Sequence, residues 1–70
     1  MRLTYDPAAD AAYVYLVDRI APGEAKQQVT ALDGAVVLDL DATGRLLGVE
    51  VVYAKRLLRP ETIEEAERRG

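Results

Sequence analysis

Residues 24–53, EAKQQVTALDGAVVLDLDATGRLLGVEVVY, decide the fold of this chain. Apolar and polar residues alternate on both sides of Asp33-Gly34, a pair that favours the tight type I′ turn of a β-hairpin. A second turn, Asp41-Ala42-Thr43-Gly44, is followed by another alternating run. The stretch therefore predicts three consecutive antiparallel strands.

The two turns also predict how these strands pair. The first turn sets Val29 opposite Leu38. A four-residue second loop sets Leu38 opposite Leu47, whereas a three-residue loop is rejected because it would mix Asp39 with Leu47 on one face. One apolar face then collects Val29, Val36, Leu38, Leu40, Leu47, Val49, Val51 and Tyr53.

The remaining segments add two strands and a helix. The run 12–18 is apolar on both faces, so we expect a central strand covered on both sides. Pro60 suits the first position of a helix. The expected fold is α+β, in one domain of residues 1–70. It is an antiparallel β-meander of about five strands (residues 2–6, 12–18, 24–32, 35–40 and 45–53) with a short C-terminal helix (residues 60–69).

The composition limits the chemistry. The 70 residues include no His, Cys, Ser, Asn or Trp, the types that supply most catalytic bases, nucleophiles and metal ligands. We therefore expect no enzyme and no cofactor. The net charge of −3 without a basic stripe argues against nucleic-acid binding by this chain alone. Since no membrane span or signal peptide is visible, we expect a cytoplasmic protein.

The sharpest motif, residues 39–50, nearly fits the calcium loop D-x-D-x-[DN]-G-x₅-E, with Thr43 where Asp or Asn is usual. Its oxygen ligands would be Asp39, Asp41 and Glu50. The flanking residues are β-branched, which favours a hairpin over the two helices of an EF-hand. In the predicted register Asp39 and Glu50 lie four strand positions apart, about 13 Å. We therefore expect no metal site, and that spacing is too wide for a catalytic carboxylate pair.

Two further acids and four tyrosines are candidates for a site. Asp6 and Asp10 flank the turn at Pro7, where we expect their short side chains to cap the backbone. The tyrosines could line a pocket, but at strand spacing they are expected in the core or an interface. They are Tyr5, Tyr13, Tyr15 and Tyr53.

The second face of the sheet is the candidate interaction face. It carries Val37, Leu46 and Val52 among polar residues, and one helix cannot cover both faces. Mixed surfaces of this kind are typical of protein–protein interfaces. A chain of 70 residues also gains stability by associating, so we expect a homo-oligomer. A solvated face with scattered apolar residues stays open as the alternative.

Two motifs resemble a known family. Residues 5–14, YDPAADAAYV, are similar to the opening Y-D-x-x-A-D-A-L-Y-I of the small bacterial and archaeal family called domain of unknown function 2283. Residues 37–51, VLDLDATGRLLGVEV, are similar to its V-x-D-x-D-x-x-G-x-L-V-G-I-E-I, and residues 54–57 resemble A-S-K-x-L without the Ser. The resemblance covers about residues 1–58. It implies a compact β-rich domain and assigns no residue a role; some relatives look like antitoxin partners of toxin-like proteins.

Three functions remain open at this point. The first is a non-enzymatic protein-interaction module, either a homodimer or an antitoxin-like acidic partner of a basic protein. The second is a small-ligand or metal-binding domain, weakly catalytic, with a site formed across an oligomer. The third is a domain without a partner.

Overall fold

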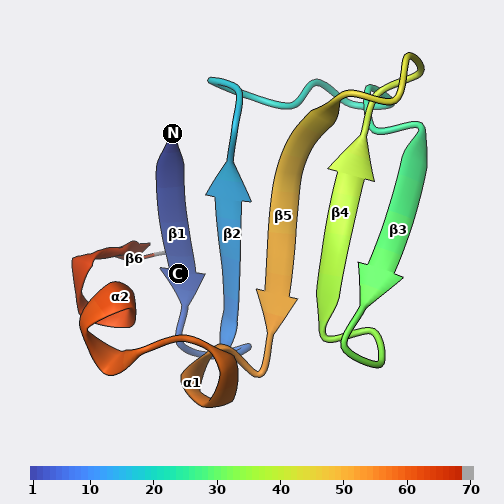
Figure 1. Cartoon of the computed structure of the whole chain (residues 1–70). Coiled ribbons are helices and arrows are strands. Elements are labelled where there is room, and N and C mark those ends of the chain that lie inside the picture. Colours follow the sequence, from blue (N-terminus) through green and yellow to red (C-terminus); the bar gives the residue numbers. More distant parts are fainter. Residues whose placement is uncertain (69–70) are drawn as a thin grey trace.

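In the computed structural model, which describes residues 1–68, one six-stranded sheet carries two short helices at one end (Figure 1). The strand order is β3-β4-β5-β2-β1-β6; β6 is parallel to β1 and every other pair is antiparallel. The expected α+β, mainly antiparallel fold is confirmed. Its elements are β1 (Arg2–Asp6), β2 (Ala11–Tyr15), β3 (Gln27–Ala31), β4 (Val36–Leu40), β5 (Leu46–Val52), α1 (Ala54–Leu57), α2 (Pro60–Glu65) and β6 (Glu67–Arg68).

The strand order differs from the predicted meander. A meander would pair β2 with β3, but residues 16–26 cross the end of the sheet and β2 pairs with β5 instead (Figure 1). This pairing sets Val14 opposite Val49 and Ala12 opposite Val51, so apolar side chains of both strands share one face. As predicted, β2 is an interior strand. The prediction that both its faces are covered is wrong, because the helices lie on one side only.

The hairpin between β3 and β4 has the predicted register. Val29 lies opposite Leu38, and Asp33 and Gly34 have the positive φ values, 57° and 86°, that a type I′ turn requires. The Ala35 amide donates to the Leu32 carbonyl oxygen at 3.1 Å and closes the turn.

The hairpin between β4 and β5 corrects the sequence analysis. The Asp41 amide donates to the Arg45 carbonyl oxygen at 2.8 Å, so the loop has the three residues that were rejected. A bulge between Asp39 and Leu40 then shifts the register, and Leu38 pairs with Val49 rather than with Leu47. Because the two deviations together shift the pairing by two positions, Val36, Leu38, Val49 and Val51 keep their predicted face. Leu46, predicted on the face opposite Leu40, instead pairs with Leu40 at the bulge.

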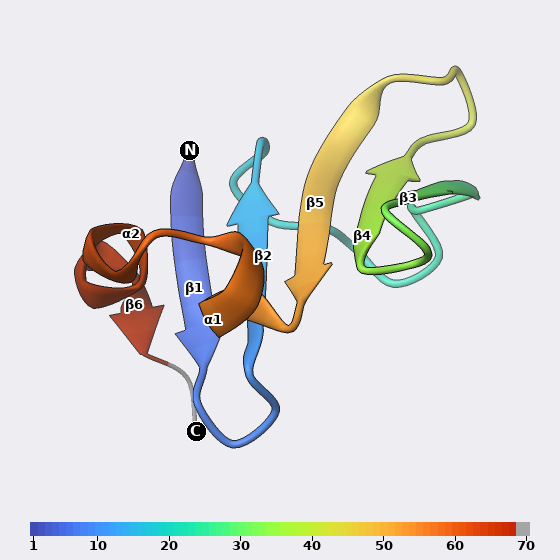
Figure 2. The same ribbon diagram turned by 60° about the horizontal axis from the view of Figure 1, so that its bottom comes forward.

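The core lies between the helices and one end of the sheet. Tyr5, Ala12 and Val51 from the sheet pack against Ala54, Ile63 and Ala66. Figure 2 shows α1 and α2 beside β1 and β2, away from β3 and β4. No helix in residues 1–68 is long and apolar enough to cross a membrane.

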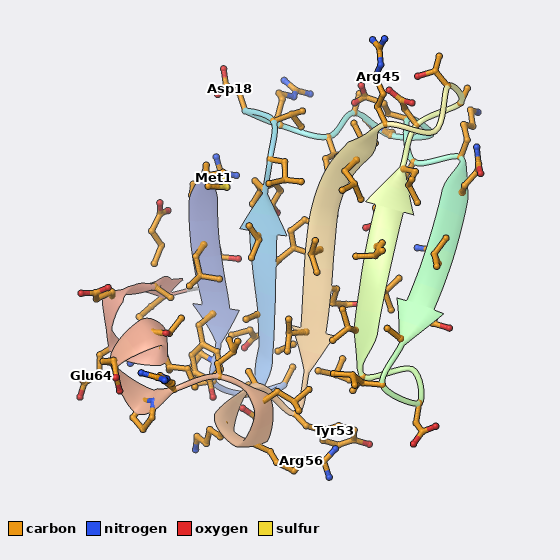
Figure 3. All side chains as sticks on the ribbon, viewed as in Figure 1. Met1, Asp18, Arg45, Tyr53, Arg56 and Glu64 are labelled. Carbon is orange, nitrogen blue, oxygen red and sulfur yellow. The ribbon has the colours of Figure 1, made fainter. Side chains whose placement is uncertain are left out.

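Two predictions about the C-terminal region need correction. Tyr53, expected on the apolar face, has a left-handed φ of 55° at the start of α1 and is 59 % exposed. Figure 3 shows it next to Arg56, whose guanidinium carbon is 5.1 Å from the tyrosine ring centroid. The expected helix 60–69 begins at Pro60 but ends at Glu65, since the chain then joins β1 as β6. Residue 69 lies outside the described residues.

The first turn is held by its two acids. Asp6 Oδ1 accepts the Ala8 amide at 3.0 Å, which confirms the expected capping for Asp6. Asp10 Oδ1 accepts the Tyr5 hydroxyl at 2.8 Å and the Lys55 amide at 3.1 Å, so it also ties the turn to α1. Burial, together with the bond to Asp10, raises the pKa of Tyr5 above its ordinary value.

Candidate functional site

The sheet face opposite the helices, called here the polar face, carries a row of hydrogen-bonded side chains from three strands. Tyr13 of β2 donates its hydroxyl to Asp39 Oδ2 at 2.6 Å. Gln28 of β3 donates its Nε2 to Asp39 Oδ1 at 2.8 Å. Asp39 is only 9 % exposed, and each of its carboxylate oxygens has a donor, as burial of a charge requires.

Gly48 makes the bond between Tyr13 and Asp39 possible. It lies on β5, opposite Asp39 on β4, and the phenol of Tyr13 must cross β5 at this point. A Cβ atom on residue 48 would lie 2.6 Å from Tyr13 Oη and 2.7 Å from its Cζ, well inside ordinary non-bonded contact. Glycine is therefore required here by the close approach of a side chain.

Burial raises the pKa of Tyr13 well above its ordinary value, and the bond to Asp39 adds to this effect. Tyr13 thus stays a protonated phenol at neutral pH and acts as a donor, not as a base. From the sequence alone, Tyr13 was expected in a core or an interface, and its role as a donor to Asp39 was not predicted. The available signal was Gly48 itself, because a glycine inside a strand often marks a close approach.

Beside this row the polar face is hollowed. The hollow has a volume of about 250 Å³ and is lined by Thr4, Asp6, Ala11, Tyr13, Tyr15 and Glu50. Glu50 is half-buried in the middle of the sheet, and its carboxylate forms no hydrogen bond or ion pair with any other residue in the described range 1–68. Two carboxylates therefore border a hollow to which residues 1–68 contribute no Lys or Arg.

An aromatic pair forms one wall of this hollow. The Tyr13 and Tyr15 rings lie 4.7 Å apart between centroids, at an interplanar angle of 52°. On the Tyr15 ring the guanidinium carbon of Arg2 lies 4.1 Å from the centroid, a cation–π contact. A second hollow adjoins the first at Thr4 and Tyr15, and its lining includes Arg2 and Arg19.

The residues of the calcium-loop motif are not brought together. Asp39 and Glu50 lie two strand positions apart, not four, because Asp39 pairs with Gly48. Asp41 caps the hairpin loop instead: its Oδ1 accepts bonds from the Thr43 hydroxyl and from the amides of Thr43 and Arg45. These bonds, the Thr43 hydroxyl first, hold the pKa of Asp41 below its ordinary value. Within residues 1–68 no group of three acidic residues could hold a metal ion.

Two of the three predicted interaction residues, Val37 and Val52, lie on the polar face, whereas Leu46 pairs with Leu40 at the bulge. Val37 and Val52 are half-buried there, where Val37 pairs with Glu50 and Val52 pairs with Ala11. Leu46 is 44 % exposed at the opposite end of β5 from Val52. These three residues therefore do not form one continuous apolar patch.

A larger apolar surface lies on the other face. Val29 of β3 and Val36, Leu38 and Leu40 of β4 are on the helix side of the sheet, but α1 and α2 do not reach them (Figures 1 and 2). Val29 is 50 % exposed, and the three residues of β4 are half-buried. We call these four residues the apolar half-face. The sequence located this face correctly, but did not show that the helices stop short of it.

The model of one family, described as Protein of unknown function (DUF2283), matches residues 2–55. The chain belongs to the DUF2283 family. The match covers β1 to β5 and the start of α1, and so includes the whole polar face row. Neither the curated proteins nor the solved structures gave a match.

The two motifs that resemble DUF2283 meet in the folded chain. Tyr13 comes from the first motif, while Asp39 and Gly48 come from the second, and all three form the hydrogen-bonded row. Tyr5 and Asp10 of the first motif also bond to each other. The motifs thus describe a framework that joins two hairpins.

Proposed function

We propose that this DUF2283 protein is a non-enzymatic interaction module that forms a homodimer through its apolar half-face. The observation that carries the proposal is surface area. A folded chain of 7.7 kDa typically exposes about 4,300 Å², whereas this chain exposes 4939 Å². The excess, about 600 Å², approaches the roughly 800 Å² that each partner contributes to a standard interface.

The apolar half-face suits a second copy of this chain. Its four members are uncharged, so two copies can meet without burying an unpaired charge. All five residues of β3 are exposed in the single chain, which leaves this edge of the sheet without a packing layer. Two sheets packed face to face about 10 Å apart would bury Val29 and Leu38 of both copies in one symmetric interface.

The small core supports the same conclusion. Of the six buried residues in the main cluster, three are alanines, which contribute little apolar area each. The cluster also lies entirely at the end of the sheet nearest the helices. A dimer would supply a second apolar layer over β3 and β4, where the single chain has none.

Two neighbouring substitutions on β3 test the interface. Val29→Glu introduces a charge into the apolar half-face, and Thr30→Glu introduces the same charge on the same exposed strand but on the polar face. We expect wild type and Thr30→Glu to show twice the chain mass in sedimentation and light scattering, and Val29→Glu to show the mass of one chain with an unchanged circular dichroism spectrum.

A third variant tests the face that the sequence favoured. If Val37→Asp alone breaks the dimer, the interface lies on the polar face and the proposal is wrong. A wild-type protein of single-chain mass at every concentration would also overturn it.

The second candidate function is the antitoxin-like one, an acidic partner of a basic protein. The observation that favours it is the hollow with Asp6 and Glu50 in its lining, in a chain of net charge −3. The two functions are compatible, because the hollow and the apolar half-face lie on opposite sides of the sheet.

A further inference from the structure

The hollow on the polar face has the charge of a cation site. Asp6 and Glu50 belong to its lining, which contains no Lys or Arg from residues 1–68. The Glu50 carboxylate lies half-buried among Tyr13 of β2 and Val37 of β4, where water reaches it less freely than at the surface. A carboxylate in such a position binds a cation more strongly than an exposed one, because the surroundings screen the charges less.

A second and independent observation concerns Thr4. It is only 5 % exposed and lines the hollow. Its hydroxyl forms no hydrogen bond with another residue in 1–68, and its oxygen is accessible to solvent, because no fully buried side-chain oxygen or nitrogen in this range lacks a partner. The hydroxyl is therefore open to a hydrogen-bond partner from the hollow. A ligand in the hollow that carries N–H groups would supply one, while its charge faces Glu50.

The aromatic wall indicates the shape of that ligand. Arg2 already places its guanidinium 4.1 Å from the centroid of the Tyr15 ring, so this ring accepts a planar cation within the chain itself. A guanidinium group can stack on an aromatic ring and at the same time direct a pair of N–H donors to one carboxylate, whereas an ammonium group is a point charge without a plane. The volume of about 250 Å³ equals about eight water molecules, enough for a guanidinium group and part of its stem.

We propose that this hollow binds the guanidinium group of an arginine side chain presented by a partner protein. The guanidinium bonds Glu50 and the Thr4 hydroxyl and lies beside Tyr13, because Arg2 already lies on the ring of Tyr15. The adjoining hollow is lined by Arg2, Arg19 and Glu67 and is therefore less favourable for a cation than the first hollow. This proposal goes beyond the homodimer and does not depend on it.

Binding is measured by titrating isotope-labelled protein with N-acetyl-arginine methylamide and following the backbone amide signals. The citrulline counterpart has the same shape without the charge, and the lysine counterpart has the charge without the plane. We expect saturable shifts at Thr4, Ala11 and Glu50 with the arginine probe, and markedly weaker binding of the other two.

The matched variants are Glu50→Gln and Glu61→Gln. Glu50→Gln removes one negative charge from the hollow, and Glu61→Gln removes one negative charge from the exposed surface of α2. Glu50→Gln should weaken arginine binding about tenfold or more, and Glu61→Gln should leave it unchanged. Equal binding of the citrulline probe, equal loss in both variants, or shifts that do not saturate would overturn the proposal. The spectra also show whether each variant is folded.

A peptide with one arginine between alanines distinguishes the source of the guanidinium. Tighter binding of this peptide than of the capped amino acid supports a partner protein, and equal binding would assign the hollow to a small guanidinium compound instead. Val29→Glu, which breaks the proposed dimer, should leave the titration unchanged. Failure of this proposal is therefore distinguishable from failure of the homodimer.

Discussion

Replacement of Gly48 by alanine is the sharpest test of the polar face row. The new methyl carbon would lie 2.6 Å from Tyr13 Oη, so the phenol must move and its bond to Asp39 breaks. Loss of a hydrogen bond to a charged group costs about 1.5–3 kcal/mol, and overpacking adds about 1–3 kcal/mol. About 0.5–1 kcal/mol of this loss is offset, because the unfolded chain has a lower backbone entropy with alanine than with glycine at position 48.

The expected net effect of Gly48→Ala is a loss of about 2–5 kcal/mol in the free energy of unfolding. For a domain of this size that lowers Tm by roughly 8–40 °C. Chemical denaturation at one fixed protein concentration measures the loss, since the stability of a dimer depends on concentration.

A double-mutant cycle isolates the cause. In a Tyr13→Ala background the methyl group meets no ring, so Gly48→Ala should be neutral or slightly stabilising. Gly44 is the matched control, because its φ is 86° and a Cβ there would meet nothing within 4 Å. Gly44→Ala should therefore cost the same in both backgrounds. The reasoning is refuted if Gly48→Ala costs less than about 0.5 kcal/mol, or costs the same with and without Tyr13.

Two further predictions follow from the same hydrogen bonds. The pKa values of Tyr5 and Tyr13 are raised in the folded state, so their stabilisation is complete below the unfolded value of about 10 and declines as the pH rises above it. Unfolding free energies measured between about pH 8 and pH 11 should fall at the alkaline end, and less so in Tyr13→Phe; an equal decline in both proteins would contradict this. Asp10→Ala should lower the denaturation midpoint more than Asp6→Ala, because Asp10 joins Tyr5 and Lys55, whereas within residues 1–68 the Asp6 side chain accepts one hydrogen bond, from the Ala8 amide. Equal midpoints would show that the tie to α1 contributes nothing.

The local turns could be predicted from sequence, and the long-range pairing could not. Asp33-Gly34 specifies its own turn, because a type I′ geometry requires positive φ at both positions. The bulge at Asp39 carries no comparable signal, so the loop length and the placement of Leu46 were wrong, while Leu38 and Val49 were placed on the correct face. The pairing of β2 with β5 also has no local cause: it depends on which apolar strands gain most by sharing a face.

The candidate site was predicted only in part. The sequence marked residues 39–50 as unusual, and the structure accounts for this through the capping of the loop by Asp41 and the burial of Asp39. Residues 39–50 match the calcium-loop pattern because an alternating strand sequence is followed here by an acidic turn. The hollow was not foreseen, because it combines β1, β2 and β5, and the predicted order placed β5 away from the first two strands.

The position of β5 in the sheet sets the order in which the chain can fold. The hairpins β1–β2 and β3–β4 each close over a short turn, so they form early. They share no strand pairing, and β5, the last of the five to leave the ribosome, pairs with β2 on one side and β4 on the other. A chain that stops before residue 46 would hold two separate hairpins. The arrival of β5 turns them into one sheet.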